Sequence, residues 1–424
     1  MSAIVLLLLG LGGMAAGYLL YSRFIATRIY KLDPNFRTPA HEYEDGVDFV
    51  PTNRFVLWGH HFTSVAGAAP IVGPAIAVIW GWLPAFLWVV LGTVFFAGVH
   101  DSGALWASVR NRAKSVGSLT GEVVGRRART VFMIVIFLVL LMVNAVFGVV
   151  IAKLLINNPG AVVPVWGAIA VALVIGQLIY RRVIGLGVVS VVGVIALYSL
   201  IYIGPQVPVE LPQQVMGLSA NASWILLLFA YAAIASLLPV WVLLQPRDYI
   251  NGLQLFVGLI LLYGAVLIGN PQVVAPMINN DVPAGTPSLL PLLFVTIACG
   301  AISGFHGLVA SGTSSKQLDK EPDARFVGYF GAVGEGALAL AAIIAATAGF
   351  ATLADWQAVY TAFGDGSLTA FVNGGANILA GGTGMDVGVA ATLLTVMAAL
   401  FAGTTMDTGL RLQRYIFQEW GEIY

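Results

Sequence analysis

Apolar residues fill this chain in long, nearly unbroken stretches separated by short polar segments. A helix needs about 20 mostly apolar residues to cross the hydrocarbon core of a bilayer. Eleven stretches are predicted to be such helices: 3–20, 63–80, 83–100, 131–152, 162–179, 183–203, 223–244, 252–268, 289–310, 328–350 and 387–405. No run shows the period-2 alternation of a membrane β-barrel strand. The pattern therefore predicts an all-α integral membrane protein with about eleven transmembrane helices.

The composition supports this class. Of the 424 residues, 59% are hydrophobic and 9% are charged, whereas about 25% of the residues of a soluble protein are charged. Such a chain cannot cover a water-facing surface, which excludes a soluble enzyme, a nucleic-acid-binding protein and a disordered protein. The one cysteine, Cys299, excludes a disulfide framework and a thiolate metal cluster. Stretch 3–20 has no small-residue cleavage site and is expected to be a retained helix.

The basic residues predict an orientation. Cytoplasmic loops of membrane proteins are enriched in Lys and Arg. If the N-terminus lies outside, all of the 20 basic residues except Lys153 fall in cytoplasmic loops. A missing or extra helix would disturb this alternation. We therefore expect the N-terminus outside and the C-terminus in the cytoplasm.

The helix count also suggests an internal repeat. Without the first helix, ten helices remain, and two halves of five would lie in opposite orientations, as in an inverted repeat. The expected organisation is an N-terminal helix and cytoplasmic linker (1–54), a ten-helix core (55–405) with repeats at about 55–204 and 222–405, and a cytoplasmic C-terminal segment (406–424). Residues 21–54 are expected to be a solvated linker. Residues 351–386 form a long external loop, whose stretch 367–380 is expected to be a short interfacial or re-entrant helix.

The first helix of each half is predicted to be broken. Proline and glycine interrupt these helices: Gly67, Pro70 and Pro74 in 63–80, and Pro239, close after Ser236 and Leu237, in 223–244. Lipid cannot satisfy the freed backbone groups, so a broken helix persists only where it lines a cavity within the protein. Each break alone favours an ordinary proline kink, but a matched pair favours a binding site.

Polar groups at this depth are candidates for substrate binding. No basic residue lies near the membrane midplane, so an anionic substrate would be held by the N–H groups of half-helix N-termini. Polar side chains at similar depth either contact substrate or Na⁺, or only hydrogen-bond between helices. The candidate substrate-binding residues are Gly67, Ala68, Asn144, Ser236, Leu237 and Ser303.

Ionisable side chains within spans are costly and are usually functional. Histidine titrates near physiological pH and suits a proton relay, although each of these groups is also compatible with a hydrogen-bonded position between helices. We expect several to meet at the cytoplasmic mouth. The candidates for proton or ion coupling are Glu335, His306, His60, His61, His100, Asp101, Asp407, Thr404 and Thr405. No third ligand stands at helical spacing from the His60–His61 pair, so no metal site is predicted.

The sequence contains no catalytic Ser/His/Asp series and no nucleotide-binding loop of the Gly-x₄-Gly-Lys type. We therefore expect no enzyme activity and no cofactor. Transport would be driven by an H⁺ or Na⁺ gradient, and the expected partners are a small-molecule substrate and the lipid bilayer, without nucleic acid.

Several of these motifs resemble one known family. Stretch 59–75 is similar to the first core helix of the carbon starvation protein (CstA) family. Further similar stretches are 98–101, 301–306, 311–318, 404–408 and 414–419. The resemblance implies a LeuT-like five-plus-five inverted-repeat fold and uptake of peptides or small carboxylates such as pyruvate across the bacterial inner membrane during starvation. Members of that family generally continue past the 404–408 block into further helices, so a short subfamily or a truncated chain is expected.

Together these features predict a secondary active transporter for pyruvate-like carboxylates or short peptides. Its substrate would bind between the two broken helices. Two alternatives stay open at this point: a membrane receptor that senses a metabolite without moving it, and a passive channel.

Overall fold

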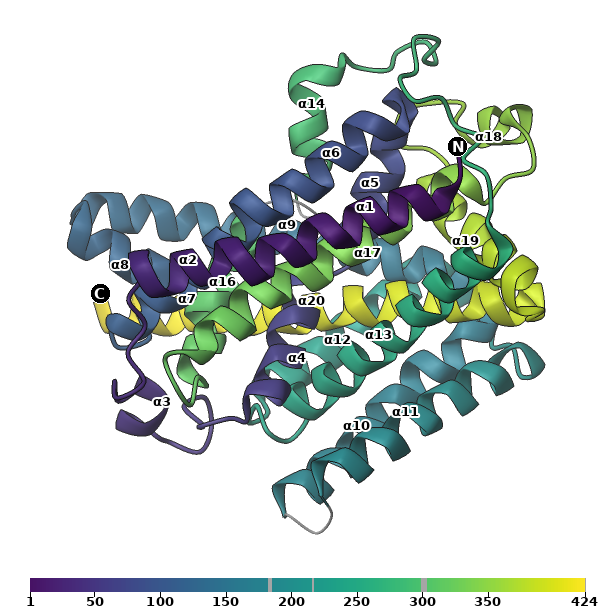
Figure 1. Ribbon diagram of the computed structural model, residues 1–424. Coiled ribbons are helices and arrows are strands. Elements are labelled where there is room, and N and C mark those ends of the chain that lie inside the picture. The colour runs from purple at the N-terminus through teal and green to yellow at the C-terminus, as the bar shows by residue number, and fades with distance from the viewer. Residues whose placement is uncertain (182–184, 216, 299–302, 424) are drawn as a thin grey trace.

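The structure is a computed structural model and describes residues 1–181, 185–215, 217–298 and 303–423 (Figure 1). Within them, the regular structure is helical apart from one short antiparallel hairpin, β1 (Gln214–Val215) and β2 (Leu218–Ser219). Nine helices in these parts of the chain are long and apolar enough to cross a membrane, and a bent pair would make a tenth. The all-α class and a multi-pass membrane protein are therefore confirmed.

The first half of the chain contains six spanning units. They are α1 (Ala3–Ala16), η1 (Gly17–Tyr21), α2 (Ser22–Phe24) and η2 (Ile25–Ile29) as one rod; α4 (Arg54–Ala66), α5 (Ala69–Ala77) and η3 (Val78–Trp80) as the bent pair; α6 (Trp82–Gly92), η4 (Thr93–Ala97) and α7 (Gly98–Arg110); α9 (Arg126–Asn157); η5 (Pro159–Ala161) and α10 (Val162–Tyr180); and α11 (Leu186–Ile203) with η6 (Gly204–Gln206). Two short helices, α3 (Pro39–Glu42) and α8 (Val116–Val123), lie between them.

The second half continues with α12 and ends in the longest helix of the described chain. Its elements are α12 (Ala220–Leu237), α13 (Leu244–Gly269), α14 (Leu289–Thr296), α16 (Gly304–Gly312), η7 (Ser314–Lys316), η8 (Arg325–Tyr329) with α17 (Phe330–Ala348), α18 (Leu353–Val359), α19 (Ser367–Thr383) and α20 (Val387–Ile423). A helix is thus present in the predicted stretch 367–380. It packs against α13, α17 and α20.

The predicted break in the first core helix is confirmed. α4 ends at Ala66, α5 begins at Ala69, and the two segments meet at 44°. Gly67 lies between them with φ +56° and ψ −154°, a conformation that only glycine adopts readily. Pro70 follows in the first turn of α5, where its missing N–H has no helical partner to lose.

The predicted break within 223–244 is wrong. α12 ends at Leu237, and Pro239 lies in the turn that leads to α13, so the proline separates two helices instead of bending one. Leu238 is extended (φ −73°, ψ 149°), as the residue before a proline prefers. α13 consequently begins at Leu244, earlier than the predicted start at 252.

An interruption lies instead in the span predicted at 289–310. Helix α14 ends at Thr296 and α16 begins at Gly304. Ser303 is extended (φ −135°, ψ 129°), and its hydroxyl accepts a hydrogen bond from the N–H of Phe305 at 3.2 Å. Cys299 and the first two residues of the 301–306 motif fall outside the described residues.

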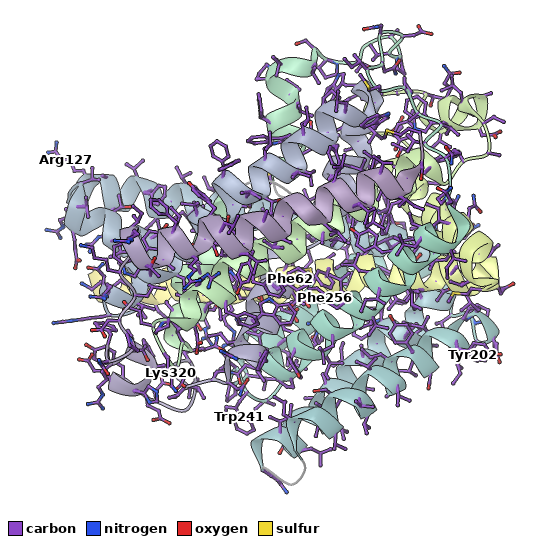
Figure 2. All side chains as sticks on the ribbon, in the orientation of Figure 1. Phe62, Arg127, Tyr202, Trp241, Phe256 and Lys320 are labelled. Atoms are coloured by element: carbon purple, nitrogen blue, oxygen red, sulfur yellow. The ribbon has the colours of Figure 1, made fainter. Side chains whose placement is uncertain are left out.

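The two chain ends lie at opposite ends of the helix bundle (Figure 1). Arg127 and Lys320 lie toward the end where α20 finishes, and Tyr202 lies toward the other (Figure 2). α17 is enclosed by its neighbours, whereas large apolar side chains of α9 and α11, such as Leu138 and Val191, are more than half exposed. Lipid-facing helices have this apolar exterior.

The segment predicted to be a solvated linker is in part docked on the bundle. Asp48 accepts hydrogen bonds from Arg411 Nη1 at 3.2 Å and from the Tyr415 hydroxyl at 2.7 Å, and it forms an ion pair with Arg414. All three partners belong to α20. Residue 48 therefore fastens the N-terminal segment to the last helix.

Candidate functional site

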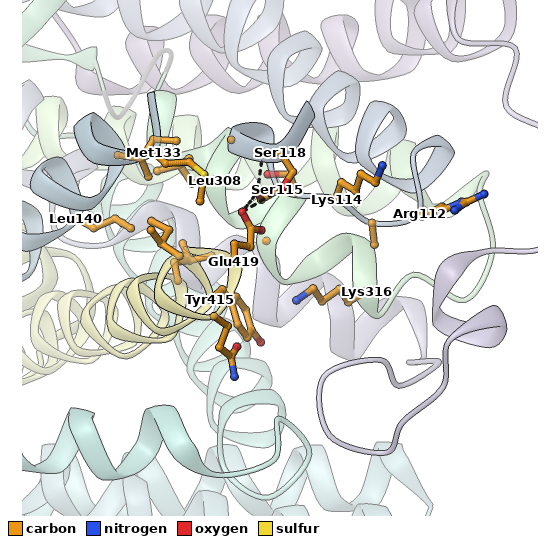
Figure 3. A pocket seen from close by; sticks show the side chains of 18 residues that line it. Arg112, Lys114, Ser115, Ser118, Met133, Leu140, Leu308, Lys316, Tyr415 and Glu419 are labelled. Carbon is orange, nitrogen blue, oxygen red and sulfur yellow. Dashed lines mark hydrogen bonds between the residues drawn. The ribbon is translucent and has the colours of Figure 1, made fainter. Parts of the chain in front are cut away.

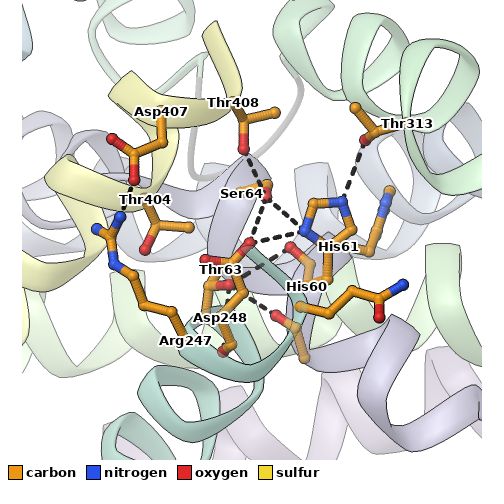
Figure 4. Close-up of polar contacts among 12 residues, drawn as sticks. His60, His61, Thr63, Ser64, Arg247, Asp248, Thr313, Thr404, Asp407 and Thr408 are labelled. Atoms are coloured by element: carbon orange, nitrogen blue, oxygen red, sulfur yellow. Dashed lines mark hydrogen bonds and ion pairs between the residues drawn. The ribbon is translucent and has the colours of Figure 1, made fainter. Parts of the chain in front are cut away.

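Buried polar side chains gather around α4, whose residues from Val56 to Ala66 are all buried. His60 Nδ1 lies 2.7 Å from Asp248 Oδ2 on α13, and His60 Nε2 lies 3.2 Å from Thr313 Oγ1 (Figure 4). Ser64, one turn further on, lies 3.3 Å from the same Asp248 oxygen and 2.9 Å from Thr408 Oγ1 on α20. We call these five residues the His60–Asp248 cluster.

A second group forms a line of alternating acids and imidazoles across four helices. His306 Nε2 of α16 lies 2.9 Å from Glu335 Oε2 of α17, and His306 Nδ1 lies 2.9 Å from Asp101 Oδ2 of α7. His61 Nε2 of α4 lies 3.9 Å from the same Asp101 oxygen. These four side chains, which we call the Glu335–His61 chain, are at most 1% exposed.

Small residues let these helices approach one another. A Cβ atom at Gly331 of α17 would lie 3.0 Å from His61 Cδ2, and one at Gly328 would lie 2.8 Å from the Ser102 backbone beside Asp101. His61 Nδ1 lies 2.9 Å from the Ser314 hydroxyl, which fixes the ring from its other side. The chain therefore depends on close helix contacts that larger residues would prevent.

The Glu335–His61 chain lies deep within the helices that carry it. Glu335 is ten residues beyond Arg325, where its span begins, and Asp101 is nine residues before Arg110, where its span ends. At 1.5 Å per residue, both are roughly 15 Å from those ends, about half the thickness of the hydrocarbon core. A row of carboxyl and imidazole groups at that depth is suited to passing protons.

At the outer edge of this chain, His100 is about one-third exposed, and its Nδ1 lies 3.2 Å from Asp101 Oδ1. His100 is thus the most exposed imidazole in contact with the buried row.

A third group is an ion pair between α13 and α20. Arg247 Nη1 pairs with Asp407 Oδ2, and the two side chains are 3% and 1% exposed. The Tyr231 hydroxyl of α12 accepts a hydrogen bond from Arg247 Nη1 at 2.7 Å and donates one to Asp407 Oδ2 at 3.0 Å. The predicted coupling residue Asp407 is therefore engaged with an arginine and lies apart from the Glu335–His61 chain.

The two predicted threonines link α20 to its neighbours. The Thr404 hydroxyl accepts a hydrogen bond from Asn251 Nδ2 at 3.3 Å. The Thr405 hydroxyl donates to the carbonyl oxygen of Ser64 at 3.0 Å, close to the break in α4. A Cβ atom at Gly67 would lie 2.8 Å from Thr405 Oγ1, so this threonine closes over the break.

The predicted substrate-binding residues do not form one group. Gly67 and Ala68 lie at the break before α5, whose Ile71 and Val72 N–H groups already donate to the Ala68 carbonyl. Asn144 Nδ2 of α9 donates to Gln413 Oε1 at 3.1 Å, and Ser303 caps α16. These positions belong to three different parts of the bundle.

Ser236 and Leu237 were predicted to lie at a half-helix N-terminus, and this is wrong. They end α12, so this terminus presents carbonyl oxygens instead of N–H groups. Arg414 Nη1 donates to the Ser236 carbonyl at 2.9 Å, and Arg411 Nη2 donates to the Leu238 carbonyl at 2.5 Å. The Leu237 side chain is 69% exposed. This helix end cannot hold a carboxylate in the way that was expected.

Asp248 and Arg247 were missed because the sequence between the predicted spans 223–244 and 252–268 was assigned to a loop. Tyr231 lay inside a predicted span but was not singled out. A signal was present in Pro246, since proline is common in the first turn of a helix. Had α13 been started there, Arg247 and Asp248 would have appeared as two charged residues inside a membrane span. Among the described residues, no group of three His, Cys, Asp or Glu side chains is arranged to hold a metal ion.

The sequence was compared with known protein families and proteins. A model of the family described as "Carbon starvation protein CstA" matches residues 2–354. The pyruvate/proton symporter BtsT of Escherichia coli K12 is 38% identical over 341 residues, which cover 78% of this chain and 47% of BtsT. The peptide transporter CstA of Campylobacter jejuni is 36% identical over 354 residues, covering 81% of this chain and 50% of that protein.

A third relative, the peptide transporter CstA of Bacillus subtilis, is 33% identical over 462 residues, which cover 100% of this chain and 76% of the relative. The chain spans about half the length of the first two relatives. No solved structure matches it. The names of the family and of these relatives point to transporters and not to enzymes.

Proposed function

The chain belongs to the carbon starvation protein CstA family, and we propose on this premise that it is a proton-coupled transporter of a pyruvate-like carboxylate or of short peptides. The names of the relatives support both substrate classes. The observation that carries the proton coupling is the buried Glu335–His61 chain. A relative named as a proton symporter favours H⁺ over Na⁺.

The proposed architecture has eleven spans. Nine straight spans and the bent α4/α5 pair account for ten, and α14 with α16 would form the eleventh as a second discontinuous helix. Successive spans would then cross the membrane in opposite directions. Every basic residue except Lys153 would fall on one side of the membrane, which we assign to the cytoplasm. We therefore propose that the N-terminus lies outside and the C-terminus inside, in the inner membrane of a bacterium.

We further propose a LeuT-like core of two inverted repeats within 55–405, after the N-terminal unit 1–54 and before the C-terminal segment 406–424. The interrupted helix α4/α5 supports such a core, because transporters of this type use discontinuous helices at the substrate site. The interruption between α14 and α16 falls in the third helix of the second half, so it does not pair with the one in α4/α5. The break at Gly67 and Ala68 would contact the substrate. Expression of the protein would rise during nutrient starvation.

In this proposal Glu335 and His306 carry the transported proton. Their partner Asp101 connects them to His61 on α4, the segment that ends at the break. A change in protonation would alter these contacts and thereby the position of α4 relative to α7 and α17. Proton transfer and exposure of the substrate site would then be linked through one helix.

The test is uptake of radiolabelled pyruvate and of a dipeptide into proteoliposomes, with pH and Na⁺ gradients imposed separately. We expect accumulation above equilibrium under an inward H⁺ gradient alone. The Glu335→Gln variant should bind substrate but not accumulate it. Glu210→Gln is the matched control because it makes the same chemical change at an exposed position.

Other outcomes would contradict the proposal in distinct ways. Gradient-driven uptake that is normal in Glu335→Gln would remove that residue from the proton path. Accumulation driven only by Na⁺ would identify a different coupling ion. Equilibration without accumulation would indicate a passive channel, and binding without flux would indicate a receptor.

A further inference from the structure

A cavity of about 320 Å³ opens at the end of the molecule where α20 finishes (Figure 3). It lies between α8, α9, α16 and the last turns of α20, away from the Glu335–His61 chain. Its walls combine apolar side chains with a smaller number of charged and hydroxyl groups. The apolar lining residues are Met133, Ile136, Leu140, Leu308, Leu412 and Ile416. Its volume lies at the lower end of the range for small-molecule sites, roughly 300–1,000 Å³.

One cation in the cavity wall has no acidic partner among the described residues. Within the described part of the chain, no carboxylate lies within 4.0 Å of Lys316 Nζ. The ammonium group lies 3.8 Å from the centre of the Tyr415 ring and 5.4 Å from that of Phe49. Burial lowers the pKa of Lys316, and the more distant Asp48 and Glu419 only partly oppose this effect. An anion bound at this ammonium group would relieve its desolvation.

The other charged groups of the rim are already engaged or point outward. Lys114 pairs with Glu122, and Arg112 is exposed and points away from the cavity (Figure 3). The Glu419 carboxylate accepts hydrogen bonds from the hydroxyls of Ser115 at 3.0 Å and Ser118 at 3.1 Å. Lys316 is thus the charged group of the lining that remains for a ligand.

We propose that this cavity is a binding site for a small monocarboxylate with a branched apolar body. Lys316 takes the carboxylate, and the Met133, Ile136 and Leu140 wall of α9 with Leu308 of α16 takes the apolar part. The opposed placement of one cation and one apolar wall selects for such an amphiphilic anion over a neutral or purely polar solute. This site does not depend on proton coupling and stands or falls separately from the proposed transport.

The probes are 4-methylpentanoate, its neutral isostere 4-methylpentanamide, and acetate, which lacks the apolar body. Binding is measured by isothermal titration calorimetry on the purified full chain in detergent at neutral pH and low salt. We expect one saturable site for 4-methylpentanoate, and binding at least about tenfold weaker for the amide, because a charged hydrogen bond is lost. Acetate should also bind more weakly, because the apolar wall stays wet.

Two variants of Lys316 and two of its neighbours complete the test. Lys316→Gln should weaken 4-methylpentanoate roughly tenfold to a hundredfold, while Lys316→Arg keeps the charge and most of the affinity. Arg112→Gln, the matched control, should change it by less than about threefold. Glu419→Gln removes a nearby negative charge and should tighten binding by roughly threefold.

Binding should also weaken as the pH rises through the lowered pKa of Lys316, since the ammonium form is the one that attracts the carboxylate. Equal affinity for the acid and the amide, or unchanged affinity in a folded Lys316→Gln protein, would overturn the proposal. If that variant does not fold, the acid–amide comparison on the unaltered chain decides. Failed uptake with intact 4-methylpentanoate binding would contradict the transport proposal alone.

Discussion

The buried ion pair between Arg247 and Asp407 gives a prediction whose size follows from its surroundings. Replacing Arg247 by Met leaves the Asp407 carboxylate with Tyr231 as its remaining donor at hydrogen-bond distance. Replacing Asp407 by Leu leaves the guanidinium group with the same hydroxyl. In both variants a charge stays buried without its paired partner, because both side chains are at most 3% exposed. In Asp407→Leu the neighbouring Asp248, which is bonded to His60, still interacts with Arg247.

Breaking a buried pair by removing one partner costs about 3–5 kcal/mol of stability. Removing both charges leaves neither member of the pair as an unpaired buried charge. In the described structure, Arg247 Nε and Asp407 Oδ1 already lack hydrogen-bond partners, so the Arg247→Met/Asp407→Leu double variant also removes two unsatisfied atoms. It leaves the Tyr231 hydroxyl unpaired, which costs about 1–3 kcal/mol. Adding Tyr231→Phe should bring stability back to near that of the unaltered protein.

The assay is reversible unfolding in mixed micelles with increasing SDS, followed by tryptophan fluorescence. The double variant should be more stable than either single variant, with a coupling free energy of at least about 3 kcal/mol. A double variant as unstable as the sum of the two single variants would refute the reasoning, because it would mean that the two charges do not depend on each other.

Two further predictions concern the break and the docked segment. Gly67→Ala places a Cβ atom 2.8 Å from Thr405 Oγ1 at φ +56°, so we expect a loss of roughly 1–3 kcal/mol in SDS unfolding and reduced uptake. Gly264→Ala is the control, because it meets nothing within 4 Å in α13 and should be neutral or stabilising; equal behaviour of the two variants would contradict a special role for the break. Asp48→Asn weakens the contact with buried Arg411 and should speed hydrogen–deuterium exchange in 43–53, whereas unchanged exchange would show that the contact does not hold this segment.

The helices were predictable because membrane spans are long and apolar, whereas their ends were not. The prediction for 83–100 ends before Asp101, but the helix continues to Arg110. Hydropathy marks the part of a helix that lies in lipid, and it has no signal for polar turns that pack against other helices. The same limit hid the start of α13 and with it Asp248.

Proline has two structural effects in this chain, and the sequence alone did not distinguish them. Near Gly67 a proline follows a glycine that can adopt a positive φ, and the helix breaks and resumes. At Pro239 there is no such glycine, and the chain turns into a new helix. The predicted spans placed His306 and Glu335 inside the membrane, where ionisable side chains are rare. Their contacts with each other and with Asp101 depend on helix packing that one sequence does not encode locally.

The polar contacts of α4 explain why this short helix can connect distant parts of the site. Successive residues of a helix point about 100° apart, so His60 and His61 face different neighbours. His60 bonds to α13, His61 bonds to η7, and Ser64 bonds to α20. Each bond lies in the buried interior, where leaving it unmade costs about 1–3 kcal/mol.

A rotation of α4 would break these bonds together, because all three belong to one rigid helix. Gly67 interrupts the backbone hydrogen-bond ladder at the C-terminal end of this helix. In the proposed transport cycle α4 therefore has two discrete positions, each with its own set of partners, instead of a continuous range. In this proposal, a proton on the Glu335–His61 chain shifts the balance between the two positions of α4 through His61. A substrate at Gly67 shifts the same balance from the other end of the helix.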